Sequence, residues 1–178
     1  MHYLYHAVPN DMRGTVLYPL NVLKDTQPDL YENLVKKYIG REDVTLLAPV
    51  PPLDCVWNDV LYFSPIHPQK IDQALIDITG SGLKIRKFYQ IDPELLDPQN
   101  TTVYLPPLPS EKDQQRPEDF VNYIPKEMEK YSVLPDITKR YYKKAHDLGW
   151  TILAYNRIPQ ILHKGSLDIT NIPIITIE

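Results

Sequence analysis

Proline is the residue type that most limits what this chain can fold into. The 178 residues contain 18 prolines and only 6 glycines. Proline is thus about twice as common as its usual share of roughly 5%. Each proline fixes one φ angle, and few glycines are left to act as hinges. We therefore expect long, rigid and ordered connections between the elements of this fold.

Length and composition indicate one globular domain. The chain is long enough to bury a sizeable core, and its 43% hydrophobic and 24% charged residues are ordinary values for a globular protein. We expect residues 1–178 to form a single domain. The polar, proline-rich stretch at 106–119 is predicted to be a long exposed loop, because too little chain follows it for a second core.

Charge and cysteine content exclude some classes of protein. The 19 basic and 23 acidic residues give a net charge of −4, which argues against a protein whose main task is to neutralise a nucleic-acid backbone. A local basic pocket stays possible. The single cysteine, Cys55, cannot form an internal disulfide and is expected to be buried rather than reactive. No apolar run reaches the length of a membrane span, so we expect a cytoplasmic protein without membrane contact.

Hydrophobic periodicity predicts short strands and two or three helices. The strand-like segments are residues 2–8, 15–18, 56–64, 84–91, 101–105, 151–155, 158–163 and 172–177. The predicted helices are residues 25–38, with Pro28 in the first turn, 69–78 and 135–148, and residues 92–96 form a helical turn. Strands and helices do not strictly alternate, so the predicted fold class is α+β.

The residues alone give few chemical candidates. None of the five histidines has the spacing of a zinc site. His6 is either a half-buried strand histidine or a site residue, and His67 follows a strand in a loop, where functional residues are common. The turn from Gly80 to Gly82 lacks the lysine and hydroxyl residue of a phosphate-binding loop.

Two basic segments remain as candidate anion contacts. Lys84 and Arg86 share one face of a predicted strand, and either grip a phosphate or form a solvated face. The helix at 135–148 carries four basic residues with interleaved tyrosines, a pattern that suits nucleic acid but stands in a net acidic chain. The four are Lys139, Arg140, Lys143 and Lys144.

Several stretches resemble those of small bacterial proteins known only as group-specific. They are His6–Pro9, Val16–Asn21, Trp57–Pro65 and Ile161–Ile169. The likeness covers nearly the whole chain and implies no function.

A more distant resemblance does imply one. Leu4-Tyr5-His6 is similar to the opening strand of ADP-ribosyltransferases of the DarT and poly(ADP-ribose) polymerase types, and Val60–Pro65 is similar to their strand with a Tyr-Phe pattern. The end of the chain, from Gln160 to Ile177, fits their last strands. The resemblance implies a mixed or antiparallel split sheet and NAD as the cofactor.

The resemblance also implies roles for individual residues. His6 would hold the ribose next to nicotinamide, Tyr62 would stack on nicotinamide, Ser64 would contact the cofactor, and Arg157 would hold the diphosphate. Gln160 stands where the family has a catalytic glutamate. A glutamine can bind a ribose hydroxyl, but it cannot act as a base or stabilise a cation by charge.

Three functions therefore stay open. The first is an NAD-dependent ADP-ribosyltransferase with His6, Tyr62 and Gln160 at its catalytic positions and a nucleic acid or protein as acceptor. The second is a non-catalytic module that binds a nucleotide or a protein, for example in bacterial or phage conflict. The third is a protein-interaction module that uses the loop at 106–119. The order of His6 and Tyr62 favours the first, and Gln160 favours the second.

Overall fold

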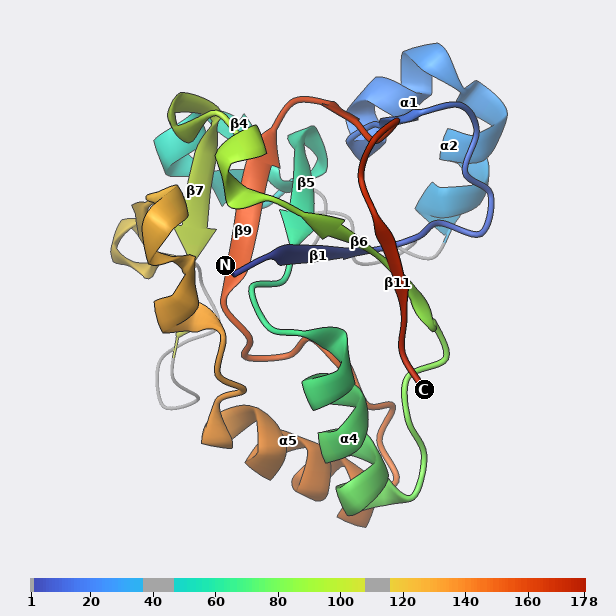
Figure 1. Cartoon of the computed structure of the whole chain (residues 1–178), viewed down its shortest axis with the longest axis vertical. Helices are drawn as coiled ribbons and strands as arrows, with labels where there is room; N and C mark the ends of the chain where they lie inside the picture. The colour runs from blue at the N-terminus through green and yellow to red at the C-terminus, as the bar shows by residue number, and fades with distance from the viewer. Residues whose placement is uncertain (1, 37–46, 108–115) are drawn as a thin grey trace.

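The computed structural model describes residues 2–36, 47–107 and 116–178, which form an α+β fold with two main antiparallel sheets (Figure 1). The four-stranded sheet has the order β5 (Val60–Phe63), β9 (Gln160–Lys164), β7 (Thr101–Tyr104), β8 (Phe120–Asn122). The three-stranded sheet has the order β1 (Leu4–Ala7), β6 (Lys87–Ile91), β11 (Ile174–Thr176). Two short pairs join β2 (Val16–Leu17) to β10 (Leu167–Asp168) and β3 (Pro49–Val50) to β4 (Cys55–Val56).

One isolated bridge connects the two main sheets. The N–H of Tyr5 in β1 donates to the carbonyl of Ser64, 2.8 Å away, and the N–H of Ser64 donates back to the Tyr5 carbonyl at 2.9 Å. A longer antiparallel ladder would next place Ala7 opposite Tyr62, but the two strands separate after this single pair. The sheet is therefore split beside the outer edge of β5.

Both faces of the four-stranded sheet are buried, which explains the continuous apolar runs in its central strands. Leu61, Phe63 and Ile161 face the core that lies between the two sheets. Their neighbours Val60 and Leu162 face a second cluster, which covers the opposite side. The alternation follows from the two-residue period of a strand.

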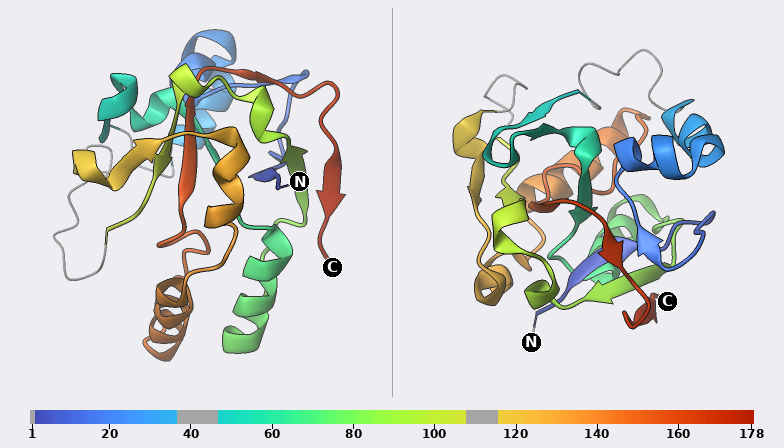
Figure 2. Two further views of the ribbon diagram at one scale, coloured as in Figure 1. Left: turned by 60° about the vertical axis from the view of Figure 1, so that its left-hand side comes forward. Right: turned by 90° about the horizontal axis from the view of Figure 1, so that it is seen from above.

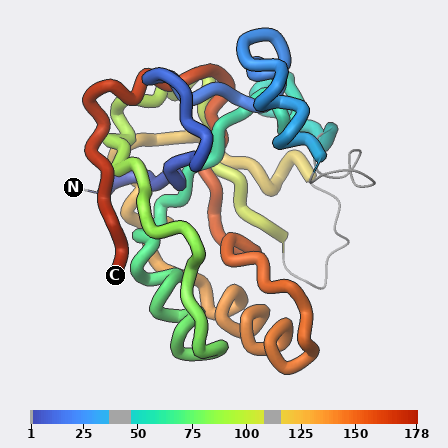
Figure 3. Tube along the Cα trace, turned by 90° about the vertical axis from the view of Figure 1, so that its right-hand side faces the viewer, coloured from blue at the N-terminus to red at the C-terminus, as the bar shows by residue number. Residues whose placement is uncertain are grey.

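The α-helices form two pairs at opposite ends of the molecule. Figures 2 and 3 show α4 (Pro68–Thr79) beside α5 (Asp136–Asp147), with α1 (Leu20–Thr26) and α2 (Pro28–Val35) at the other end. The first pair encloses a third cluster, in which Ile71 and Tyr142 are fully buried. No helix in the described residues is long and apolar enough to cross a membrane.

Short 3₁₀ helices that begin at proline fill many of the connections. A proline in the first position already has a helical φ angle and has no N–H to leave unpaired. These helices are Pro51–Leu53, Pro93–Leu95, Pro98–Asn100, Pro117–Asp119 and Pro125–Tyr131. Another 3₁₀ helix, Trp57–Asp59, lies between β4 and β5.

The predicted α+β class and most elements are confirmed, including the helices at 69–78 and 135–148. The helix predicted at 25–38 corresponds to α2, which begins at Pro28 rather than at residue 25, and the preceding helix α1 was not predicted. The two helices break at Gln27, because Pro28 disfavours a helical conformation in the residue before it. The last residues of that prediction lie outside the described residues.

Other differences concern strands. Residues 151–155 form turns and irregular structure rather than a strand, and their apolar residues Ile152 and Ala154 pack against the α4–α5 cluster. Residues 57–59 interrupt the strand predicted at 56–64, and β8 and β10 were not predicted. Most of the loop predicted at 106–119 lies outside the described residues.

A buried carboxylate fixes the turn after α4. Asp72 is fully buried, and its Oδ1 accepts hydrogen bonds from the Leu83 N–H at 2.6 Å and from Arg86 Nη1 at 2.7 Å. Gly82 lies so close that a Cβ atom there would be 2.3 Å from the same oxygen. Glycine is therefore required for steric reasons at this position.

We predict that Gly82→Ala lowers the free energy of unfolding by about 1–3 kcal/mol, because the new methyl group displaces the Asp72 carboxylate from its two donors. Urea denaturation measures the effect. The control is Ser81→Ala at the exposed neighbouring position, which we expect to stay within about 0.5 kcal/mol of the original chain. Equal stability of the two variants would contradict this account of the turn.

Candidate functional site

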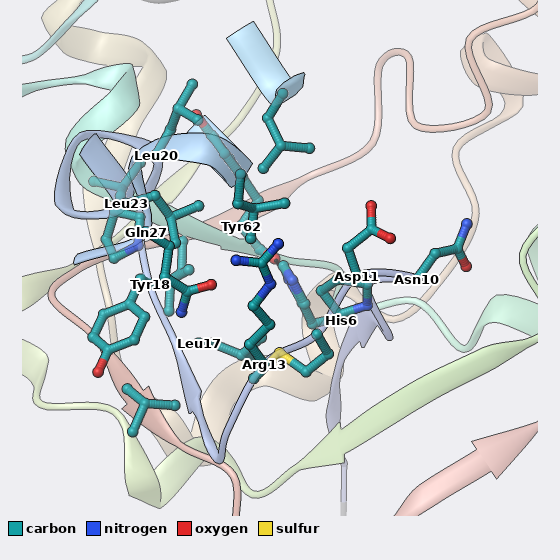
Figure 4. A pocket seen from close by; sticks show the side chains of 18 of the residues that line it. His6, Asn10, Asp11, Arg13, Leu17, Tyr18, Leu20, Leu23, Gln27 and Tyr62 are labelled. Atoms are coloured by element: carbon teal, nitrogen blue, oxygen red, sulfur yellow. Dashed lines mark hydrogen bonds between the residues drawn. The ribbon is translucent and has the colours of Figure 1, made fainter. Parts of the chain in front are cut away.

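A cavity of about 480 Å³ lies along the free edge of β5, where the sheet is split (Figure 4). Its walls come from β5, from the loop at 9–13 that follows β1, and from α1 and α2. Most of the lining is apolar. Besides the tyrosines Tyr18 and Tyr62, the polar side chains in the wall are His6, Asn10, Asp11, Arg13 and Gln27.

The imidazole of His6 occupies the place where the β1–β5 ladder stops. Its Nδ1 lies 2.7 Å from the carbonyl oxygen of Tyr62, on the unpaired edge of β5. A carbonyl can only accept, so Nδ1 carries the hydrogen and Nε2 is left with a lone pair. Burial lowers the pKa of His6, although the hydrogen bond to Tyr62 opposes the shift.

This geometry makes His6 a neutral, oriented hydrogen-bond acceptor in the cavity wall. Its ring is held from one side by Phe63, with the ring centroids 5.6 Å apart. Figure 4 shows His6 among the side chains that line the cavity, together with Arg13 and Asp11. Such a group suits a ligand hydroxyl or amide N–H, because both donate to a neutral imidazole nitrogen.

Tyr62 also lines the cavity, but its ring is already engaged. It packs against Trp57, with centroids 5.6 Å apart and ring planes inclined by 36°. Its hydroxyl donates to the Trp57 carbonyl. Stacking of this ring on nicotinamide stays a prediction, and a ligand would have to use the face away from Trp57.

Ser64 lies at the sheet junction rather than in the described cavity wall. Its side chain is buried, and its hydroxyl both donates to the Ile66 carbonyl and accepts from the Ile66 N–H, each at 3.1 Å. The hydroxyl thus closes the turn that leads from β5 to α4.

Gln160 and Arg157 also lie away from the described cavity wall. Gln160 begins β9 and pairs with Tyr104 of β7. Arg157 has a positive φ of 62° in the turn before β9, and its guanidinium donates to the Pro107 carbonyl. Of the predicted site residues, the structure therefore brings together His6 and Tyr62, and not Ser64, Arg157 or Gln160.

Sequence reasoning missed the cavity's polar residues in the loop at 9–13 and at the helix break. Arg13 lies in a polar run between two strand-like segments, a place where binding residues are common. Gln27 immediately precedes Pro28, and that dipeptide was itself a signal for a break in the helix. Neither signal specifies a cavity, because the contact between these two segments is long-range.

Two other histidines, His67 and His163, have structural roles. His67 is the N-cap of α4, and its Nδ1 accepts from the Gln69 N–H at 3.2 Å. His163 Nδ1 lies 2.9 Å from the Thr101 hydroxyl, which itself donates to the Asp97 carbonyl. Burial lowers the pKa of both histidines.

Within residues 2–36, 47–107 and 116–178, no group of three or more histidine, cysteine or carboxylate side chains is placed to hold a metal ion. No protein-family model, curated protein or solved structure matches the chain.

We predict that the free energy of unfolding falls as the pH is lowered from about 7.5 to about 5.5. Burial depresses the pKa values of His6, His67 and His163 in the folded chain. Below the ordinary histidine pKa of about 6.5, the unfolded chain therefore binds more protons than the folded one, which destabilises the fold. Urea denaturation at several pH values measures this slope.

The variant His67→Asn isolates the contribution of His67 to the pH dependence of the free energy of unfolding. Asparagine keeps an acceptor for the Gln69 N–H at the N-cap but does not titrate. We expect a shallower pH dependence in this variant than in the original chain. An unchanged slope would show that the protonation of His67 does not destabilise the start of α4.

Proposed function

We propose that the cavity beside His6 binds a nucleotide of the NAD type, and that the chain is a binding module rather than a transferase. The observation that carries this proposal is the neutral acceptor nitrogen of His6, fixed in the cavity wall by the Tyr62 carbonyl. A ribose hydroxyl is a suitable donor for it.

The size and lining of the cavity support a small-molecule ligand. Its volume of about 480 Å³ lies within the roughly 300–1,000 Å³ of typical ligand sites. Apolar side chains from α1, α2 and β5 suit a planar heterocycle, and the few polar groups suit a sugar. A nucleotide combines both parts in one molecule.

The resemblance to ADP-ribosyltransferases agrees with this ligand. The resemblance implies that a histidine on the first strand and a tyrosine on a later strand contact the same ligand. His6 and Tyr62 line the same cavity here. Two antiparallel sheets that meet at a single bridge also agree with a split sheet. Membership of the family stays a proposal.

Gln160 favours binding over transfer of ADP-ribose. Its side chain has no charge to stabilise a cationic transition state, and it lies outside the described cavity wall. In the described part of that wall the carboxylate is Asp11, which is exposed on the loop and therefore well solvated. Transfer to a nucleic acid or protein acceptor is the alternative.

We predict that NAD and ADP-ribose raise the melting temperature of the protein, because a ligand that binds only the folded state stabilises it. The variant His6→Phe keeps a ring against Phe63 but removes the acceptor nitrogen. We expect it to weaken NAD binding on the order of tenfold, the usual effect of one lost hydrogen bond. Calorimetric titration measures the affinity.

The control is His146→Ala, an exposed histidine on α5 at the far end of the molecule. We expect it to bind NAD like the original chain. The proposal is wrong if no nucleotide binds, or if His6→Phe binds NAD as tightly as His146→Ala does. Release of nicotinamide from NAD above the rate of a protein-free sample would favour the transferase instead.

A further inference from the structure

A bidentate ion pair engages Arg13, a residue of the cavity wall. Arg13 lies in the loop after β1 and lines the cavity, and Asp29 lies in the first turn of α2. The guanidinium donates through Nη1 to Asp29 Oδ1 at 3.0 Å and through Nη2 to Oδ2 at 2.7 Å. Both contacts connect the loop to the helix.

The Arg13 guanidinium can exchange Asp29 for another anion at little cost. The side chains are 53% and 64% exposed, and an ion pair in water contributes little net stability. The two parallel donors of an arginine fit a phosphate as well as a carboxylate. An incoming anion can therefore replace Asp29 without leaving a buried charge unpaired.

We propose that Arg13 is the phosphate-binding residue of this cavity and that Asp29 occupies the phosphate position when no ligand is bound. The proposal rests on the nucleotide function above and narrows the ligand to one with a phosphate near its ribose. Among the described lining residues, Arg13 is the one with a permanent positive charge. Arg157, to which the resemblance gives this role, binds the Pro107 carbonyl elsewhere.

Gln27 supplies a second, independent observation at the same end of the cavity. Its Oε1 is buried and has no hydrogen-bond partner among the described residues. A buried oxygen without a donor is unfavourable. Figure 4 shows this side chain pointing into the cavity toward Arg13. A ribose hydroxyl beside the phosphate is a donor of the required kind.

The neighbouring charge does not oppose this assignment. Asp11 lies in the same loop and also lines the opening. It is exposed, so solvent and salt screen its repulsion of a bound anion. The direct hydrogen bonds of the guanidinium are screened much less.

The test compares nicotinamide mononucleotide with nicotinamide riboside, which lacks the phosphate, by calorimetric titration. We expect Arg13→Gln to weaken binding of the mononucleotide on the order of tenfold or more and to leave riboside binding unchanged. We expect Asp29→Asn to tighten mononucleotide binding several-fold, because the competing carboxylate is gone. The matched control is Lys24→Gln, which removes an exposed positive charge from α1 outside the described cavity wall.

The outcomes separate the two proposals. If the riboside and mononucleotide bind but Arg13→Gln affects the mononucleotide no more than Lys24→Gln does, Arg13 does not bind phosphate and the proposed function stands. If Arg13→Gln abolishes binding of both ligands, the residue maintains the cavity and its assignment to phosphate is wrong. If neither ligand binds the original chain but NAD does, the assignment of Arg13 to phosphate is wrong and the proposed function stands. If NAD does not bind either, both proposals are wrong.

Discussion

The single backbone pair between Tyr5 and Ser64 determines much of this architecture. It holds the two main sheets together and then ends, so the strands separate on the side where β5 has an unpaired edge. The next carbonyl on that edge, from Tyr62, takes its hydrogen bond from the side chain of His6 instead of from a backbone N–H. Because His6 rather than a backbone N–H binds the Tyr62 carbonyl, the strands part to form a cavity, and the tautomer of the histidine that lines it is fixed.

The rest of the cavity is formed by a proline-fixed helix break and by the loop after β1. Pro28 ends α1 and begins α2, so the chain turns at Gln27 and both helices cover the split. The loop at 9–13 closes the other side, where Arg13 pairs with Asp29. The apolar walls come from β5, which also builds the core, and from α1 and α2, whereas the polar groups come from the loop, the helix break and the sheet junction. Binding sites commonly have apolar walls from rigid helices and strands and polar groups from the loops and breaks between them.

Sequence patterns predicted the helices and strands whose hydrophobic residues recur with a regular period. Helical spacing predicted α4 and α5, and strand alternation predicted β1 and β6, because each has one consistent period. The apolar residues at 151–155 imitated a strand, although they pack against α4 and α5 from a turn. For the site, the resemblance selected His6 and Tyr62, which do line one cavity. Arg13 and Gln27 could not be selected, because no local pattern reveals that a loop and a helix break meet.

Long-range nitrogen–proton NMR of the histidine rings shows directly whether His6 presents a neutral Nε2 acceptor to a nucleotide. We expect His6 to carry its proton on Nδ1 in the free protein, and nicotinamide mononucleotide to shift its Nε2 signal toward a hydrogen-bonded value. His163, whose Nδ1 faces the buried Thr101 hydroxyl, serves as the internal reference and stays unchanged. A proton on Nε2 of His6, or a His6 signal that does not respond to saturating ligand, would contradict the account.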